Sequence, residues 1–318
     1  MSVPYAVPDG FDPRLRGPQI AAPPPASLPA WVEQLLAGSP VVPLRGRGGR
    51  PDVCRRDANG WRQISTAVPN VRGLDVLTFQ QAVMDAFAAI FDQLGPTGSV
   101  HPVRFWAFVP EIHAQLEPDL DRYMVFNAAR FAAFSAWYGG RDAFPRALAT
   151  ASAVGTSGSD LVLHCLAADS AGQPVENPRQ VPAYRYSRRF GPMPPCFARA
   201  TVVRPRGGTC LLMVGGTASI RGEESMHETD LGAQMDETLA NLASVVGAAW
   251  SGCTEGRAAL GRYRQLRAYH RREADRREVE ARMQSAFPNL DRLELLSAEL
   301  CRAELLVEVE GLAEGPPA

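Results

Sequence analysis

The sequence contains no lysine, and all 33 of its basic residues are arginines. This absence excludes a lysine Schiff base, and with it covalent pyridoxal phosphate chemistry. It also excludes the lysine that a phosphate-binding P-loop requires. The arginines suit the recognition of carboxylates, because a guanidinium pairs with a carboxylate through two parallel hydrogen bonds. An arginine-only composition can equally reflect a GC-rich genome.

Motifs for metal and disulfide chemistry are also missing. The six cysteines form no CxxC pair, which excludes the usual zinc spacings and disfavours a disulfide framework in a chain of 318 residues. The five histidines lie far apart and match no ligand spacing. We therefore expect neither a metal nor a cofactor.

Long apolar runs and a strong net charge are absent as well. No apolar run approaches the roughly 20 residues needed to span a bilayer. The first residues, MSVPYAVPDGFDP, lack the basic and apolar regions of a signal peptide. The net charge of -1 creates no field that would recruit nucleic acid or an anionic membrane. These features indicate a cytoplasmic protein without nucleic-acid or membrane partners.

The composition that remains, 46% hydrophobic and 21% charged, is that of a globular protein. Residues 1 to about 30 are rich in Pro and Ala, and a short helical stretch follows them. We interpret this Pro- and Ala-rich part as an arm or linker that is hardly a core, and we assign residues 1–40 to an N-terminal arm.

Two downstream segments repeat the same order of elements, which is helix, strand, helix and closing strand. The first copy is expected at 77–95, 103–112, 120–140 and 160–169, and the second at 230–250, 263–271, 272–287 and 304–313. This pattern predicts an α+β fold of two divergent β-β-α-β-α-β repeats, a subdomain at 41–175 and another at 176–318. The alternative is a coincidence between two α+β segments.

The stretch GGTASIRG follows an apolar run and ends it in small residues. It matches neither GxGxxG nor a P-loop. Its backbone N–H groups and the hydroxyls of Thr217 and Ser219 are able to hold an anion. A tight turn at the end of a strand is the alternative interpretation.

A segment rich in tyrosine and arginine, AYRYSRRF, lies shortly before Arg199. Guanidiniums can bind a carboxylate while a phenol such as Tyr186 donates to a hydroxyl or ether oxygen. The mixture therefore suits a carboxylated, unsaturated small molecule. Stacking on single-stranded nucleic acid and an ordinary surface loop are the alternatives.

The last predicted strand, LLVEVEGL, places Glu308 and Glu310 on one face because side chains alternate along a strand. This face either is exposed to solvent or lines a pocket. In a pocket among apolar groups the acid form of a glutamate is favoured, so it could protonate a substrate at neutral pH.

The second repeat resembles the Rid/YjgF-like fold over its whole length. Further motifs resemble the chorismatases, which are chorismate hydrolases and hydroxybenzoate synthases. These motifs, which cover roughly residues 100–310, are RYMVFNAARFAAF, ATASAVG, ENPRQVPAYRYSRRFGP, PPCFARAT and GGTASIRGEESMH. The resemblance implies a homotrimer that binds chorismate near the end of the GGTASI strand and releases pyruvate.

Residue by residue, the resemblance implies that Glu308 is the general acid and that Arg199 and Tyr186 contact the substrate. Cleavage of the enolpyruvyl ether then yields pyruvate with a dihydroxycyclohexadiene carboxylate, a 3-hydroxybenzoate or a 4-hydroxybenzoate. The sequence does not decide among these products.

The resemblance also implies residues that shape the site. Ala218 and Ser297 match positions that tune the product, and Arg292 lies close to an arginine that holds a carboxylate in Rid enzymes. Gly216 lets the backbone approach the substrate, beside Thr217. Two other functions stay open, a Rid-type deaminase of 2-imino acids and a non-catalytic small-molecule-binding trimer.

Overall fold

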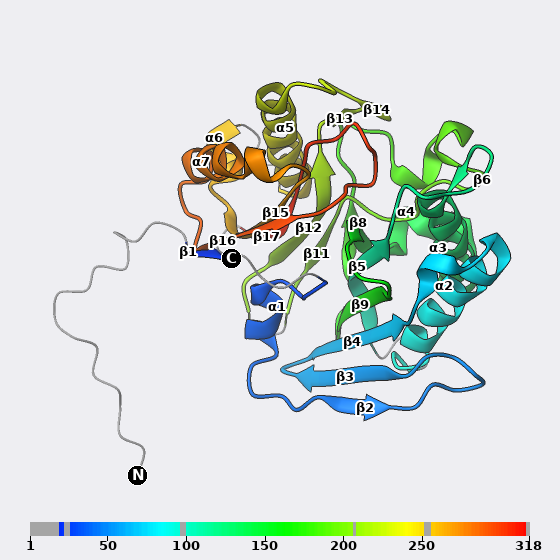
Figure 1. The fold of residues 1–318 in the computed structure, drawn as a ribbon. Helices are drawn as coiled ribbons and strands as arrows, with labels where there is room; N and C mark the ends of the chain where they lie inside the picture. The colour runs from blue at the N-terminus through cyan, green and yellow to red at the C-terminus, as the bar shows by residue number, and fades with distance from the viewer. Residues whose placement is uncertain (1–18, 22–25, 96–99, 206–207, 251–255, 316–318) are drawn as a thin grey trace, which may run out of the picture.

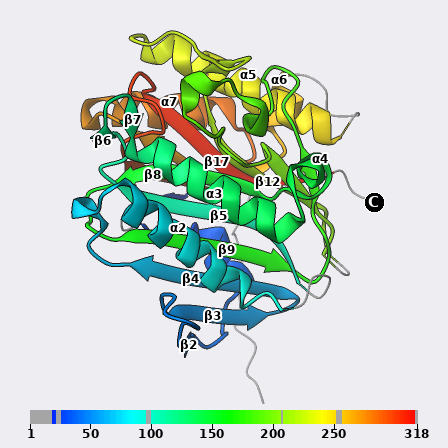
Figure 2. The same ribbon diagram turned by 90° about the vertical axis from the view of Figure 1, so that its right-hand side faces the viewer.

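The computed structural model describes residues 19–21, 26–95, 100–205, 208–250 and 256–315. They form an α+β structure in which two large β-sheets pack against each other through their inner faces (Figure 1). Helices α2 (Val76–Phe91) and α3 (Arg122–Tyr138) cover the outer face of the first sheet (Figure 2). Helices α5 (Leu231–Ala249) and α7 (Arg276–Ala286) cover the outer face of the second.

The two sheets repeat one strand order. In spatial order the first consists of β2 (Val42–Leu44), β3 (Val53–Ala58), β4 (Trp61–Val68), β9 (Leu161–Ala168), β5 (His101–Pro110) and β8 (Thr150–Thr156). The second consists of β10 (Gln173–Val175), β11 (Ala200–Val203), β12 (Leu211–Ala218), β17 (Val307–Glu314), β15 (Tyr263–His270), β16 (Arg292–Ser297) and, at its edge, β1 (Gln19–Ala21).

The pairing directions also correspond. In each sheet the strands that follow the two long helices, β5 with β8 and β15 with β16, run parallel. The closing strand, β9 or β17, lies antiparallel between its neighbours. The predicted repeat is thus confirmed, with one strand more per copy than expected: β8 and β16 lie between the second helix and the closing strand.

Three of the four outer helices begin at an aspartate that caps their first backbone N–H groups. Asp75, Asp121 and Asp230 accept from the third residue after them at 2.9, 2.8 and 3.0 Å. Gly139 ends α3 in the left-handed conformation, at φ 77°. No helix in the described ranges is both long and apolar enough to cross a bilayer.

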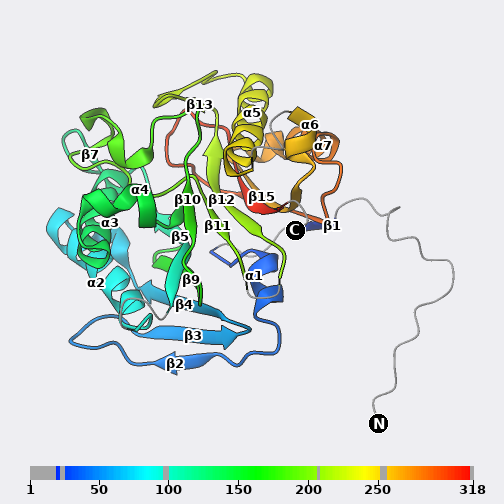
Figure 3. The same cartoon turned by 180° about the vertical axis from the view of Figure 1, so that it is seen from behind.

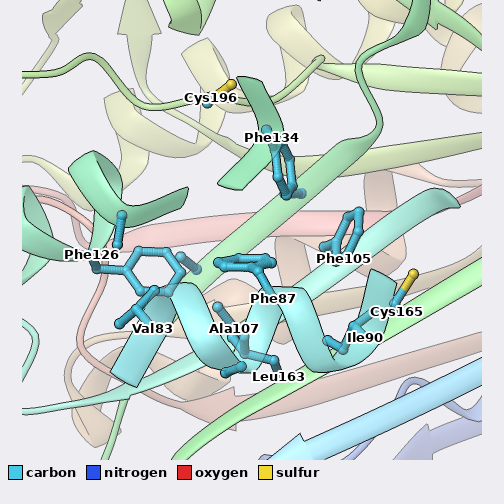
Figure 4. Close-up of a cluster of buried hydrophobic side chains, with 14 of the residues drawn as sticks. Val83, Phe87, Ile90, Phe105, Ala107, Phe126, Phe134, Leu163, Cys165 and Cys196 are labelled. Carbon is cyan, nitrogen blue, oxygen red and sulfur yellow. The ribbon is translucent and has the colours of Figure 1, made fainter. Parts of the chain in front are cut away.

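Aromatic side chains fill the layer between α2, α3 and the first sheet (Figure 4). Phe87 from α2 is central there, with ring centroids 5.2 Å from Phe134, 5.9 Å from Phe105 and 6.1 Å from Phe126. Such rings bury large apolar areas, so this layer fixes both helices on the sheet.

The short helix α1 (Ala30–Leu35) lies at one end of the layer between the two sheets (Figure 3). Trp31 and Val32 are buried there, and the Trp31 ring centroid is 5.8 Å from that of Trp106 on β5. The short helix expected after the Pro- and Ala-rich stretch is thus present and packs into this layer, while the arm assigned to residues 1–40 stays a prediction. Residues 1–18 and 22–25 of the arm lie outside the described residues.

The predicted division at residue 175 stays a prediction. Strand β10, which ends at Val175, pairs with β11 in the second sheet. The smaller elements are β6 (Gln115–Glu117), β7 (Leu120–Asp121), α4 (Phe144–Ala147), β13 (Ile220–Arg221), β14 (Glu224–Ser225) and α6 (Gly256–Leu260).

A buried ion pair joins the two sheets. Arg104 of β5 donates to Glu310 of β17 at 2.6 Å, and the two side chains are 1% and 2% exposed. Ser152, Trp106 and Tyr269 also donate to the Glu310 carboxylate, at 2.5, 3.0 and 3.1 Å. A buried charge is stable only when its hydrogen bonds are satisfied, and these four donors satisfy Glu310.

The Arg104→Met variant should lower the free energy of unfolding by roughly 3–5 kcal/mol, because it leaves the Glu310 carboxylate buried without its counter-charge. Arg45→Met is the matched control, since the Arg45–Asp52 pair is 93% and 56% exposed, and it should lower the free energy of unfolding far less, because water screens an exposed pair. Urea unfolding measures both. Equal losses in the two variants would contradict this account.

Candidate active site

A cavity of about 360 Å³ lies between the two halves, beside β8 and the end of β12. Its size is typical of sites for small molecules. Its lining residues are His113, Gln115, Asp121, Tyr123, Met124, Ala151, Ser152, Ala153, Tyr186, Phe190, Pro195, Phe197, Arg199, Gly216, Ala218, Ile220, Cys301, Arg302, Ala303, Glu304 and Glu308.

Pairing between β12 and β17 places Glu308 on this cavity. Ala218 is the register partner of Glu308, and the register shifts between Val214 and Thr217. Gly216 also lines the cavity, since it lies two residues before Ala218 on the same face of β12. A Cβ atom at Gly216 would overlap the Glu308 carboxyl, so any other residue there would displace that side chain.

Glu308 is only 4% exposed, and its pKa is raised from 4.5 to about 8. Burial is the main cause, and the nearby Glu310 carboxylate raises the pKa further. Arg104, the Cys301 thiol and Arg199 oppose this shift without cancelling it. The group thus holds its proton at neutral pH, as a general acid must.

The two glutamates of β17 differ in their hydrogen bonds. Glu310 accepts four hydrogen bonds from protein donors. Among the described residues the Glu308 carboxylate accepts only a long one, from the Cys301 thiol at 3.8 Å. Donors stabilise a carboxylate, so the charge is held on Glu310 and the proton on Glu308.

Arg199 provides a buried positive charge on another wall, where it is 6% exposed. It donates to the Tyr186 hydroxyl at 2.6 Å and to the Val181 carbonyl at 3.1 Å. Its guanidinium also lies 5.2 Å from the centroid of the Phe197 ring. These contacts fix the position of the Arg199 guanidinium. The Arg199 Nε atom has no hydrogen-bond partner among the described residues.

Arg302 brings a second guanidinium to the cavity, from the loop between β16 and β17. It donates to the Glu223 carbonyl at 2.8 Å and to the Ser225 hydroxyl at 3.0 Å. The Phe190 ring stacks on it, with a centroid distance of 4.0 Å. The cavity therefore combines two arginines with one protonated carboxyl.

Comparison with known proteins places the chain in one family. The family model described as "Chorismatase FkbO/Hyg5-like, N-terminal" matches residues 49–167. A 3-hydroxybenzoate synthase from Streptomyces hygroscopicus is 34% identical over 74% of this chain and 69% of its own length. This chain belongs to the chorismatase family.

Two more chorismatases agree with this assignment. One from Streptomyces rapamycinicus is 32% identical over 71% of this chain and 68% of its own. A chorismatase crystal structure matches with a TM-score of 0.71 and 26% identity, over 86% of this chain and 80% of that one. The family resemblance seen in the sequence is thereby confirmed.

Five of the eight site residues suggested by the sequence come together in the cavity of this chorismatase-family chain. They are Glu308, Arg199, Tyr186, Ala218 and Gly216. The other three, described next, do not line it.

Thr217 lies on the opposite face of β12 from its neighbours, because side chains alternate along a strand. Its hydroxyl donates to the carbonyl of Gly215 at 2.9 Å. Ser297 lines a separate cavity with Phe108 and Tyr269. Neither residue reaches the Glu308 carboxyl, so their expected roles at the substrate are not supported.

Arg292 begins β16, where it pairs in register with Gln19 and Gln265 and lies 3.4 Å from Glu294. It is not a lining residue of the cavity. A Rid-type deaminase was expected to clamp its substrate at or beside this arginine, so its position counts against that alternative.

Cys301 and Arg302 are among the cavity residues that the sequence interpretation did not identify. They belong to the stretch LCRAELLVE, directly before the strand that carries Glu308. Their closeness to Glu308 along the chain is the feature of the sequence that could have revealed them. Their side chains reach the cavity because the loop before β17 folds back over it.

Replacing Glu308 with Gln should stabilise the protein, and more so as the pH rises. Between pH 4.5 and about 8 the folded carboxyl keeps a proton that the unfolded one has lost. The parent's free energy of unfolding therefore falls with increasing pH over this window, and Gln removes this dependence.

Differential scanning fluorimetry of Glu308→Gln and the parent between pH 5 and 8.5 measures this effect. The Tm of Glu308→Gln should exceed that of the parent by an amount that grows towards pH 8.5. Glu117→Gln, a change at an exposed residue, is the control and should show a constant gap. A constant gap in Glu308→Gln as well would show that the carboxyl does not keep its proton.

Proposed function

We propose that this protein cleaves the enolpyruvyl ether of chorismate and releases pyruvate, with Glu308 as the general acid. The observation that carries this proposal is the position of Glu308. It is a buried carboxyl with a pKa of about 8, in a cavity that also holds Arg199 and Arg302. Membership in the chorismatase family supports chorismate as the substrate.

The first step is a proton transfer. Glu308 gives its proton to the methylene carbon of the enolpyruvyl group, whose double-bond electrons form the new C–H bond. The carbon attached to the ether oxygen becomes an oxocarbenium ion, and Glu308 becomes a carboxylate. Arg104 and Arg199 both favour the charged form of Glu308, so they assist this transfer. A positioned acid of this kind contributes on the order of 10²- to 10⁴-fold.

The second step releases pyruvate by one of two routes. Water can add to the oxocarbenium carbon and return a proton to the Glu308 carboxylate. The hemiketal then collapses to pyruvate and a dihydroxycyclohexadiene carboxylate. Alternatively, the bond between ring and ether oxygen breaks with its electrons going to oxygen, and the ring passes a C–H proton to the Glu308 carboxylate and becomes 4-hydroxybenzoate.

The two arginines match the two carboxylates of chorismate. One carboxylate is on the ring and the other on the enolpyruvyl group, so binding requires two cationic partners. Arg199 is held by Tyr186, and Arg302 by Glu223 and Ser225. Fixed guanidiniums orient the ether near Glu308 at little entropic cost during the reaction.

Two small side chains next to the acid, Ala218 and Cys301, shape the space available to water beside the ring. We place the control of the ring product on these two residues, with Cys301 in the role that the sequence assigned to Ser297. Homotrimeric assembly and a cytoplasmic location are also part of the proposal. Light scattering coupled to size exclusion tests the trimer.

The direct test is incubation with chorismate, in which pyruvate is followed enzymatically and the ring product is identified by mass and retention. Glu308→Gln should lower kcat about 10²- to 10⁴-fold. In the parent, kcat/KM should fall as the pH rises through about 8, because the acid form is then lost. No pyruvate from the parent above the Glu308→Gln level would refute the proposed function. Full activity in the variant would refute only the choice of acid.

Arg302→Gln should lower kcat/KM about 10- to 100-fold, the loss expected for one charge-assisted hydrogen bond. Arg292→Gln is the matched control, since it makes the same change outside the cavity, and it should stay within about twofold of the parent. Steady-state kinetics with chorismate decide, with Tm measured to confirm folding. A larger loss in Arg292→Gln than in Arg302→Gln would reverse the assignment.

A further inference from the structure

Helix α5 carries a buried stripe of polar side chains toward the second sheet. Gln234, Thr238 and Asn241 are fully buried, and Glu237 is 6% exposed. The spacing of three and four residues places them on one face of the helix. Polar groups are costly to bury unless they are hydrogen-bonded, so their partners show what the stripe does.

Asn241 holds the end of β12. Its amide nitrogen donates to the carbonyl oxygens of Ala218 and Ile220, at 3.0 and 2.8 Å. Both of those residues line the cavity. Ala218 is also the last residue of β12 that pairs in register with β17, and it pairs with Glu308. Asn241 therefore fixes the backbone at the point where the wall and the acid face each other.

The Asn241 amide is itself held in one orientation. Arg179 donates to its oxygen at 2.9 Å, and Glu237 accepts from the same guanidinium at 2.6 Å. Asn177 donates to the Asn241 main-chain carbonyl at 3.0 Å. With its oxygen bound to a donor, the amide presents only its nitrogen to the two β12 carbonyls.

Gln234 holds the backbone just before Glu308 in the same way. Its nitrogen donates to the Glu304 carbonyl at 2.9 Å, and its oxygen accepts from the N–H of Leu306 at 2.8 Å. Glu304 lines the cavity, and Leu306 lies two residues before Glu308. The stripe thus holds the backbone on both sides of the acid.

We propose that Asn241, supported by Gln234, is a positioning residue that sets the distance between the Ala218 wall and the Glu308 carboxyl. It does not line the cavity and acts through the β12 backbone. The effect on turnover rests on the proposed function. Misplacement of a reacting group by about 1 Å can cost about 10²-fold in rate, so a loosened β12 end should reduce kcat and change the ring product.

The test uses two variants and one control. Asn241→Ala removes both hydrogen bonds from this side chain to β12. Arg179 is partly exposed, and Arg179→Gln removes the guanidinium that orients the Asn241 amide. Thr238→Val is the control on the same buried stripe, because the Thr238 hydroxyl has no hydrogen-bond partner among the described residues. Hydrogen exchange of the segment 217–222, kcat, KM and the ratio of ring products are measured for each.

In Asn241→Ala we expect faster exchange in this segment, kcat about 10- to 100-fold lower with KM within about threefold, and a changed product ratio. Arg179→Gln should change in the same direction but less, and Thr238→Val should match the parent. Parental exchange, kcat and product ratio in a folded Asn241→Ala would overturn the proposal. If that variant does not fold, Arg179→Gln decides by the same criteria. A parent without turnover would refute the proposed function, while hydrogen exchange would still decide the positioning.

Discussion

The structure depends on one buried carboxylate, that of Glu310. Its donors come from both halves of the molecule: Arg104, Trp106 and Ser152 from the first sheet and Tyr269 from the second. A charge so far from water is stable only while all these donors are in place. The two sheets are therefore held in one relative position, and the cavity forms between them at that position. Through Ser152, which also accepts from the Gly216 N–H at 2.8 Å, the network extends to the cavity wall.

The same network determines the chemistry of the neighbouring acid. Glu308 lies two residues from Glu310 on the same face of β17, and both are buried. With the negative charge fixed on Glu310 by its donors, a second charge at Glu308 would be poorly solvated and close to the first. Glu308 therefore keeps its proton, and its pKa rises to about 8. Burial and the Glu310 carboxylate thus both prepare Glu308 for its proposed role as general acid.

The part of the cavity wall next to Glu308 is made of small residues, which a larger polar side chain fixes from behind. Gly216 and Ala218 leave room beside the acid, and Asn241 on α5 binds the strand that carries them. This arrangement separates two requirements, because the space next to Glu308 stays open while the atoms around it are fixed. A site of this kind can orient its substrate through preorganised, rigid backbone.

The sequence by itself determined the repeated order of helices and strands, apart from β8 and β16. Apolar spacing and strand alternation are local properties, so the α+β repeat and the position of Glu308 and Glu310 on one strand face followed from them. The chorismatase motifs also pointed to Arg199, Tyr186 and Ala218. Only the tertiary structure decided that β17 is buried and that Glu308 and Glu310 have different partners. Three of the four Glu310 donors, Arg104, Trp106 and Ser152, lie 206, 204 and 158 residues away along the chain, on strands whose contacts with β17 no local pattern specifies. For the same reason Arg302, and not Arg292, was found in the cavity: a loop's course over a sheet depends on what it packs against.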